Sequence, residues 1–163
     1  MMRISFLFLM LSGILIAGCQ TNEEAMVSID QLSISSEGLA DGQNYYIISP
    51  FKWKGPEEAE LVDISIVDEE GEPVNSSQGI SASFYVAADT KQSGVYRRDD
   101  IGEKQRVDGY ELTEEQTLIM QLKLNNVREN ENRRLKVLFT SGDEVHEKLL
   151  EWEAVEGLKS SAS

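Results

Sequence analysis

The chain has 163 residues, with 15 Lys and Arg against 29 Asp and Glu, and a net charge of −14. So acidic a protein lacks the cations that neutralise phosphates, which argues against nucleic-acid binding and against direct adhesion to anionic lipid. Cys19 is the only cysteine and His146 the only histidine. These counts exclude internal disulfides, redox CxxC chemistry and histidine-rich metal sites.

Residues 1–19 have the features of an export signal. Arg3 is the only charge before Glu23, and residues 4–16 form an almost unbroken apolar run. That run is too short to cross a hydrocarbon core, which takes about 20 helical residues. A basic start, a short apolar core and small residues before a cleavage site together predict a secretory signal.

Ile16-Ala17-Gly18-Cys19 resembles the lipobox of bacterial lipoproteins. The resemblance implies cleavage between Gly18 and Cys19, and a diacylglycerol on the Cys19 sulfur that anchors the protein outside the cell membrane. Two acyl chains hold a protein stably to a bilayer, whereas one holds it only marginally. Gln20 stands where some inner-membrane lipoproteins carry Asp, which favours the outer membrane in a Gram-negative host. The alternative is an ordinary secretory signal that is cleaved elsewhere.

The remaining chain is the length of one domain. We expect residues 1–18 to be the signal peptide and 19–26 the lipidated N-terminus and spacer. A β-sandwich domain is expected over 27–156 and a flexible tail over 157–163.

Alternating apolar residues and strand-forming runs predict a series of strands. The expected strands are 27–35, 45–54, 60–68, 79–89, 117–125, 134–140 and 144–153. Pro50 suggests a bend or an edge position within the second of them. Thr113 to Gln116 has the form of a helix capping box, but the alternation that follows it favours a turn entering a strand.

The alternation also predicts which side chains face the core. We expect Phe51 and Trp53 to share one buried face, and Trp152 to lie in the core or at its rim. The other predicted inward residues are Val62, Ile64, Ile66, Ile80, Ala82, Phe84, Val86, Ala88, Leu118, Met120, Leu122, Leu124, Leu135, Val137 and Phe139.

Short alternating strands separated by turn residues indicate an all-β fold, an antiparallel β-sandwich of about seven to eight strands. The order of the predicted strands resembles that of immunoglobulin-like domains in exported bacterial proteins. The cysteine pair of antibody domains is missing, so the resemblance rests on the pattern of strands alone.

A long polar segment, residues 89–115, interrupts the pattern, with weak strand signals only near 95–96 and 107–112. Long irregular segments in compact domains are often functional. Within it, Tyr96, Arg97 and Arg98 form an aromatic and basic island in an acidic protein, which makes them candidates for contact with a partner. The alternative is that Arg97 and Arg98 form surface salt bridges with Asp99, Asp100 or other nearby acids.

Catalytic and cofactor-binding motifs are absent from the sequence. His146 would have to serve any Ser-His-Asp triad, and no Gly-x-Ser-x-Gly elbow presents a serine. The acidic turns 68–72 and 99–103 lack the spacing of an EF-hand calcium loop. We therefore predict no catalytic residues, no metal site and no cofactor.

Two functions fit these observations. The first is a non-catalytic binding or interaction domain, anchored to the membrane through Cys19, with an envelope protein or the cell wall as its partner. The second is a small cell-wall glycan hydrolase that uses paired carboxylates. A solute-binding transport component is disfavoured, because such proteins resemble two-lobed α/β folds.

Overall fold

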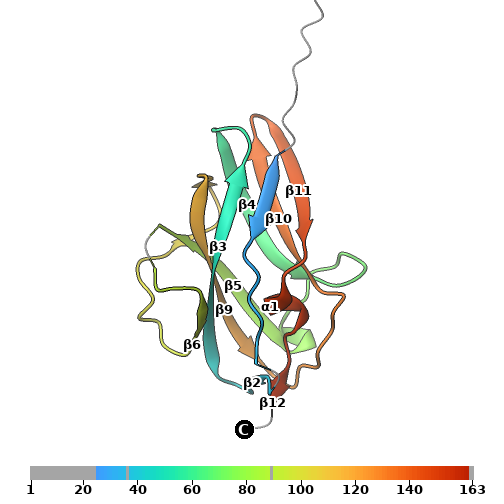
Figure 1. The fold of residues 1–163 in the computed structure, drawn as a ribbon. Coiled ribbons are helices and arrows are strands. Elements are labelled where there is room, and N and C mark those ends of the chain that lie inside the picture. The colour runs from blue at the N-terminus through green and yellow to red at the C-terminus, as the bar shows by residue number, and fades with distance from the viewer. Residues whose placement is uncertain (1–24, 36, 89, 162–163) are drawn as a thin grey trace, which may run out of the picture.

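Apolar residues at every second position fold into two antiparallel sheets that pack face to face (Figure 1). The structure, a computed structural model, describes residues 25–35, 37–88 and 90–161. The first sheet has the order β1 (Met26–Ile29), β3 (Asn44–Lys54), β9 (Glu115–Leu124), β5 (Ile80–Ala87) and β7 (Gln105–Arg106), with β6 (Gly94–Tyr96) also beside β3. The second has the order β11 (Glu144–Leu150), β10 (Arg134–Ser141), β4 (Ala59–Val67) and β8 (Tyr110–Glu111).

This arrangement confirms the predicted all-β sandwich. The long strands follow the order β1-β3-β9-β5 in one sheet and β11-β10-β4 in the other. That is the A-B-E-D and G-F-C order of constant-type immunoglobulin domains. The sequence pattern therefore indicated the correct architecture, although no disulfide joins the sheets.

The main core lies between the two sheets. The alternation predicted for β5, β9 and β10 is confirmed within these strands, since Phe84, Met120 and Val137 all lie within this core. The prediction for Ala88 is wrong, because β5 ends at Ala87 and Ala88 is exposed. Trp53 from β3 meets Phe139 from β10 edge to face, with the ring centroids 4.9 Å apart. Trp152 is fully buried in the same core.

The alternation predicted for β4 is wrong over part of its length. Leu61 is 1% exposed and Val62 is 37% exposed, although Val62 was expected to face inward. Phe139 pairs with Leu61 and Leu138 with Asp63, so Val62 is an extra residue with no partner in β10. Such a bulge shifts the alternation by one residue, and Ile64 and Ile66 face the core again.

The C-terminal segment also differs from expectation. Residues 157–161 do not form a loose tail, because Leu158 is fully buried and β12 (Ser160–Ser161) pairs in parallel with β2 (Leu39–Ala40). The last predicted strand ends at Leu150, and a short helix, α1 (Glu153–Glu156), follows Trp152. In Figure 1 this helix lies beside the open side of the sandwich, near the chain that follows β1.

Two turns show how local chemistry sets element boundaries. The Gln116 side-chain oxygen accepts from the Thr113 N–H at 2.8 Å, yet β9 begins at Glu115, so the predicted turn into a strand is confirmed. A true capping box lies elsewhere, between Asn75 and Gln78, and opens the short 3₁₀ helix η1 (Ser76–Gln78) before β5.

Candidate functional site

The first part of the long segment between β5 and β9 folds over the outer face of the first sheet. We call residues 90–104 the covering segment; after it, β7 pairs with the edge of β5 and β8 joins the second sheet. Ile101, within the covering segment, is 1% exposed and packs with Tyr46, Ile48 and Ile119, which point away from the main core. The covering segment therefore closes a second, smaller core on the outside of the sandwich.

Lys104 fixes this segment to the sheet. Its ammonium lies 5.0 Å from the centroid of the Tyr46 ring and 5.3 Å from that of Tyr85. The same ammonium pairs with the Asp99 carboxylate. Burial raises the pKa of the Tyr46 phenol, and the charge of Asp99 raises it further.

Two acids of the covering segment, Asp99 and Asp100, are paired with lysines. Asp100 lies 2.9 Å from the Lys91 ammonium, and this hydrogen bond lowers the pKa of the Asp100 carboxyl. Among the described residues, neither Arg97 nor Arg98 has a carboxylate oxygen within 4.0 Å. The expected salt bridges of the two arginines are therefore absent from the described part of the chain.

The three predicted contact residues do not form one site. Tyr96 packs against the outer core, and its hydroxyl donates to the Gln92 carbonyl at 2.8 Å. Arg97, next along the strand, lies on the other side, with its guanidinium carbon 5.8 Å from the centroid of the Tyr45 ring. Arg98 is exposed beyond the end of β6, where its charge helps to lower the pKa of Asp100.

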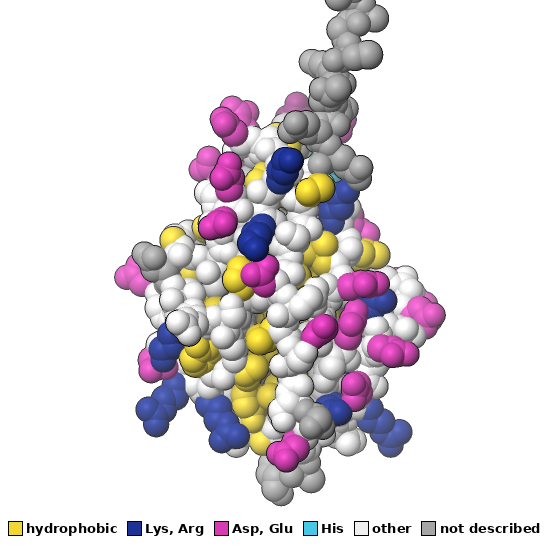
Figure 2. Space-filling model, viewed as in Figure 1, with side chains coloured by type: hydrophobic (Ala, Val, Ile, Leu, Met, Phe, Trp, Pro, Cys, Tyr) yellow, Lys and Arg dark blue, Asp and Glu magenta, His cyan; other side chains and the backbone are white. Residues whose placement is uncertain are grey.

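Arg97 instead lines a groove with Val95, two residues before it. This groove has a volume of about 380 Å³ and lies between β6 and a wall formed by Ile34, Ser35 and residues 37–40. Its other walls include Ile34, Leu39, Glu37 and the edge of Tyr45. We call it the Arg97 groove. Figure 2 shows a strip of hydrophobic side chains on this face, and Lys and Arg side chains gather at the lower left, over the region of β6.

The floor of the Arg97 groove is held in place. The Tyr45 ring is only 3% exposed, and its hydroxyl accepts from the Ala40 N–H at 2.9 Å. Val95 was not among the predicted contact residues. The sequence could have indicated Val95 through its position two residues before Arg97, because side chains two residues apart along an extended chain lie on the same face.

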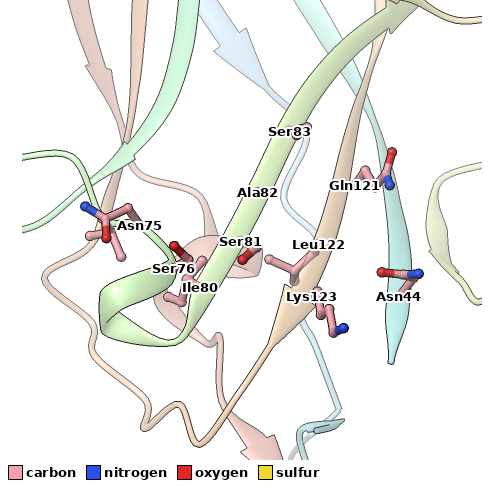
Figure 3. A pocket seen from close by; sticks show the side chains of 11 residues that line it. Asn44, Asn75, Ser76, Ile80, Ser81, Ala82, Ser83, Gln121, Leu122 and Lys123 are labelled. Carbon is pink, nitrogen blue, oxygen red and sulfur yellow. The ribbon is translucent and has the colours of Figure 1, made fainter. Parts of the chain in front are cut away.

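A second hollow lies on the outer face of the first sheet, where the covering segment does not reach. Figure 3 shows Asn44, Ser81, Ser83, Gln121 and Lys123 on three adjacent strands around a hollow of about 410 Å³. These side chains offer hydrogen bonds to a polar ligand. Polar residues on the solvated face of an antiparallel sheet are also the usual arrangement without a ligand.

A third hollow, of about 650 Å³, lies at the end of the sandwich that carries Ala25. Trp53 lines it together with Glu57, Glu111 and Glu114, all three of which are exposed. In this hollow of the described chain, carboxylates lie beside an aromatic ring, which is the arrangement that bears on the glycan-hydrolase hypothesis.

The remaining candidates have structural partners. The ring of His146 stacks on Phe139 with the centroids 5.3 Å apart. The Asp68 carboxylate accepts from the backbone N–H of Glu72 at 2.9 Å and so closes its own turn. Among the described residues, no group of three or more His, Cys, Asp and Glu side chains is placed to hold a metal ion.

The predicted lipidation site, Gly18 and Cys19, lies outside the described residues. In the part of the chain that is described, no helix combines the length and apolarity needed to span a bilayer. No protein-family model, curated protein or solved structure matches the chain.

Proposed function

We propose that this protein is anchored by lipid on Cys19 to the outer side of a bacterial membrane, and that its sandwich is a non-catalytic domain that binds another envelope component. The lipobox-like sequence before Cys19 supports the anchor. The Arg97 groove supports the binding role.

One observation carries this binding role. In a chain with a net charge of −14, the Arg97 guanidinium has no carboxylate within 4.0 Å among the described residues. It stands over an aromatic ring at the edge of a groove lined by both apolar and polar groups. Arginine and aromatic side chains are the groups that most often dominate binding energy at protein interfaces.

The placement of charge agrees with this arrangement. Met26 pairs with Lys54 at the end of β3, whereas the Arg97 groove includes Tyr45, near the start of β3. At about 3.3 Å per residue the two points are about 30 Å apart along the strand. The end near Met26 carries exposed acids that an anionic bilayer repels, among them Glu57, Glu58, Glu111, Glu114, Asp143 and Glu144. Cys19 precedes Met26 by seven residues, so with the anchor at Cys19 the groove would lie at the end of the sandwich away from the membrane.

The anchor is tested with Cys19→Ser in the native host. We expect the wild-type protein to label with a radioactive fatty acid and to sediment with membranes, and the variant to do neither. Retention of the variant in the membrane fraction at the wild-type level would refute lipid anchoring.

The binding role is tested by cross-linking in cells at native expression, followed by mass spectrometry. We expect one protein to be captured reproducibly by the wild type. Capture of glycan fragments alone, or of nothing above background, would contradict it.

The alternative function, glycan hydrolysis, has one supporting observation, the hollow lined by Trp53 and three glutamates. It predicts that the protein releases soluble fragments from purified cell walls. Replacing Glu57, Glu111 and Glu114 singly by Gln should then abolish release in at least one variant. Equal release with and without the protein would remove this alternative.

A further inference from the structure

The β6 strand has one open edge. It pairs with β3 through Tyr46–Tyr96, Ile47–Val95 and Ile48–Gly94, and no strand of the described chain pairs with its other side. Alternate residues of such an edge point their N–H and C=O groups away from the neighbouring strand. These groups are a template for an additional strand.

The Arg97 groove lies beside β6, since Val95 and Arg97 both line it. Ile34, Ser35 and residues 37–40 form its opposite wall. The lining is mixed: Ile34 and Val95 are apolar, Val95 is 38% exposed, and Ser35, Glu37 and Ser161 are polar. An extended chain beside β6 would direct alternate side chains toward this lining.

The charges beside the groove favour an acidic occupant. Arg97 has no acid partner among the described residues, and Glu37 on the opposite wall is not within 4.0 Å of it. A guanidinium binds a carboxylate through two parallel hydrogen bonds, which fixes both position and direction. Arg97 directly follows β6, which ends at Tyr96, and it lines the groove, so a peptide beside β6 would bring a carboxylate within its reach.

We infer that the Arg97 groove binds an extended peptide segment of a partner protein, which adds as a strand to the open edge of β6 and places a carboxylate against Arg97. Main-chain hydrogen bonds supply affinity in this mode, and the flanking side chains select the sequence. This inference rests on the binding role proposed above and specifies the partner's chemistry.

The test uses a phage-displayed library of short random peptides, selected on the mature protein. We expect the selected peptides to alternate apolar residues with Asp or Glu. Synthetic copies should bind Arg97→Gln at least about tenfold more weakly than wild type, because the substitution removes the two charge-assisted hydrogen bonds to the carboxylate. Arg98→Gln is the matched control and should bind as wild type does. Glu37→Gln should bind equally well or more tightly.

Hydrogen exchange locates the peptide independently of affinity. On peptide binding, amides of residues 94–97 should exchange more slowly, while those of β11, at the edge of the other sheet, stay unchanged. Failure to select peptides, binding unaffected by Arg97→Gln, or protection elsewhere would each overturn the inference. The inference would also be overturned if the protein dimerises without any peptide and Arg97→Gln abolishes this dimer. The occupant of the groove would then be a second copy of the chain.

The two proposals can fail separately. If cross-linking in cells captures the same protein with Arg97→Gln as with wild type, the binding role stands and the groove is the wrong site. If no variant captures a partner, the binding role itself fails.

Discussion

The indole ring of Trp53 meets the phenyl ring of Phe139 edge to face, with 4.9 Å between centroids and 72° between planes. The two residues come from β3 and β10, which correspond to the B and F strands that a disulfide joins in antibody domains. Cys19 is the only cysteine, so no disulfide within the chain can join the two sheets. Aromatic packing therefore connects the two sheets where related architectures use a covalent bond.

Phe139→Ala should lower the free energy of unfolding by about 3–5 kcal/mol, because it leaves a cavity between the sheets. A double-mutant cycle with Trp53→Leu and Phe139→Leu should give a coupling of about 0.5–1.5 kcal/mol. Urea denaturation measures both. His146→Ala, which removes a half-exposed ring stacked on the far side of Phe139, should cost far less. Additive effects of the two leucine substitutions would show that the ring contact contributes no coupling energy.

The bulge in β4 predicts an ordering of two neighbouring substitutions. Leu61→Ala should cost about 2–5 kcal/mol, because this side chain is buried in the main core. Val62→Ala should stay within about 0.5 kcal/mol, as for other surface substitutions. Thermal or urea unfolding of both variants gives the comparison. The uninterrupted alternation read from the sequence requires the reverse order, so the measurement distinguishes the two registers.

Lys104→Met keeps the length of the side chain but removes its charge from between Tyr46 and Tyr85. The Lys104 side chain is only 18% exposed. We therefore expect a loss of about 1–2 kcal/mol. Hydrogen exchange across residues 94–106 should also become faster, because the covering segment loses its main polar attachment.

Lys91→Met is the matched control for this change. Lys91 also pairs with an acid and lies over a tyrosine ring, but its side chain is 38% exposed. Exposed ion pairs contribute little, so its loss should cost about 0.5 kcal/mol or less. Equal effects of the two substitutions would contradict the role given to Lys104.

Asp41 makes the free energy of unfolding depend on pH under acidic conditions. A hydrogen bond from the Ser160 hydroxyl, and another from the Asn126 N–H, lower the pKa of the Asp41 carboxyl below its ordinary 3.8. Between the folded pKa and 3.8 the unfolded chain binds the proton and the folded chain does not, so stability rises with pH there. The contribution is complete above 3.8 and disappears as the pH falls through the folded pKa.

Asp41→Asn should therefore be less stable than wild type at neutral pH, with the difference shrinking as the pH falls below 3.8. Ser160→Ala removes the hydroxyl donor and should produce part of the same change. Urea midpoints measured across this range provide the test. If the difference in urea midpoint between wild type and Asp41→Asn does not change with pH, the stability of the protein is not linked to protonation of Asp41.

The sequence predicted the elements whose stability comes from their own alternation. β5 and β9 lie centrally in the first sheet, and each has one face on the main core, so the period of two is unbroken. The β4 bulge escaped prediction because Val62 is apolar and fits either face. The burial of Leu158 escaped because a short Gly- and Ser-rich tail has no period, and its position is set by the distant partner β2.

The candidate site was predicted only in part, for a similar reason. Tyr96, Arg97 and Arg98 stood out by composition, but strand geometry sends Tyr96 and Arg97 to opposite sides. The groove depends on Ile34, Ser35 and residues 37–40, which lie far from Arg97 in sequence. Such a juxtaposition follows from the sheet topology, which a pattern in one segment cannot specify.

The joining of β2 to β12 has a consequence for the order of folding. The segment after Glu151 supplies Trp152, Ala154, Val155 and Leu158 to the core, all with no measurable exposure. Gln31 bonds to Glu151 across a separation of 120 residues. Contacts between segments so distant form slowly, since the intervening loop must close first. A chain still emerging from a ribosome or a secretion channel therefore cannot complete this core, and the final step of folding waits for the C-terminal residues to be released.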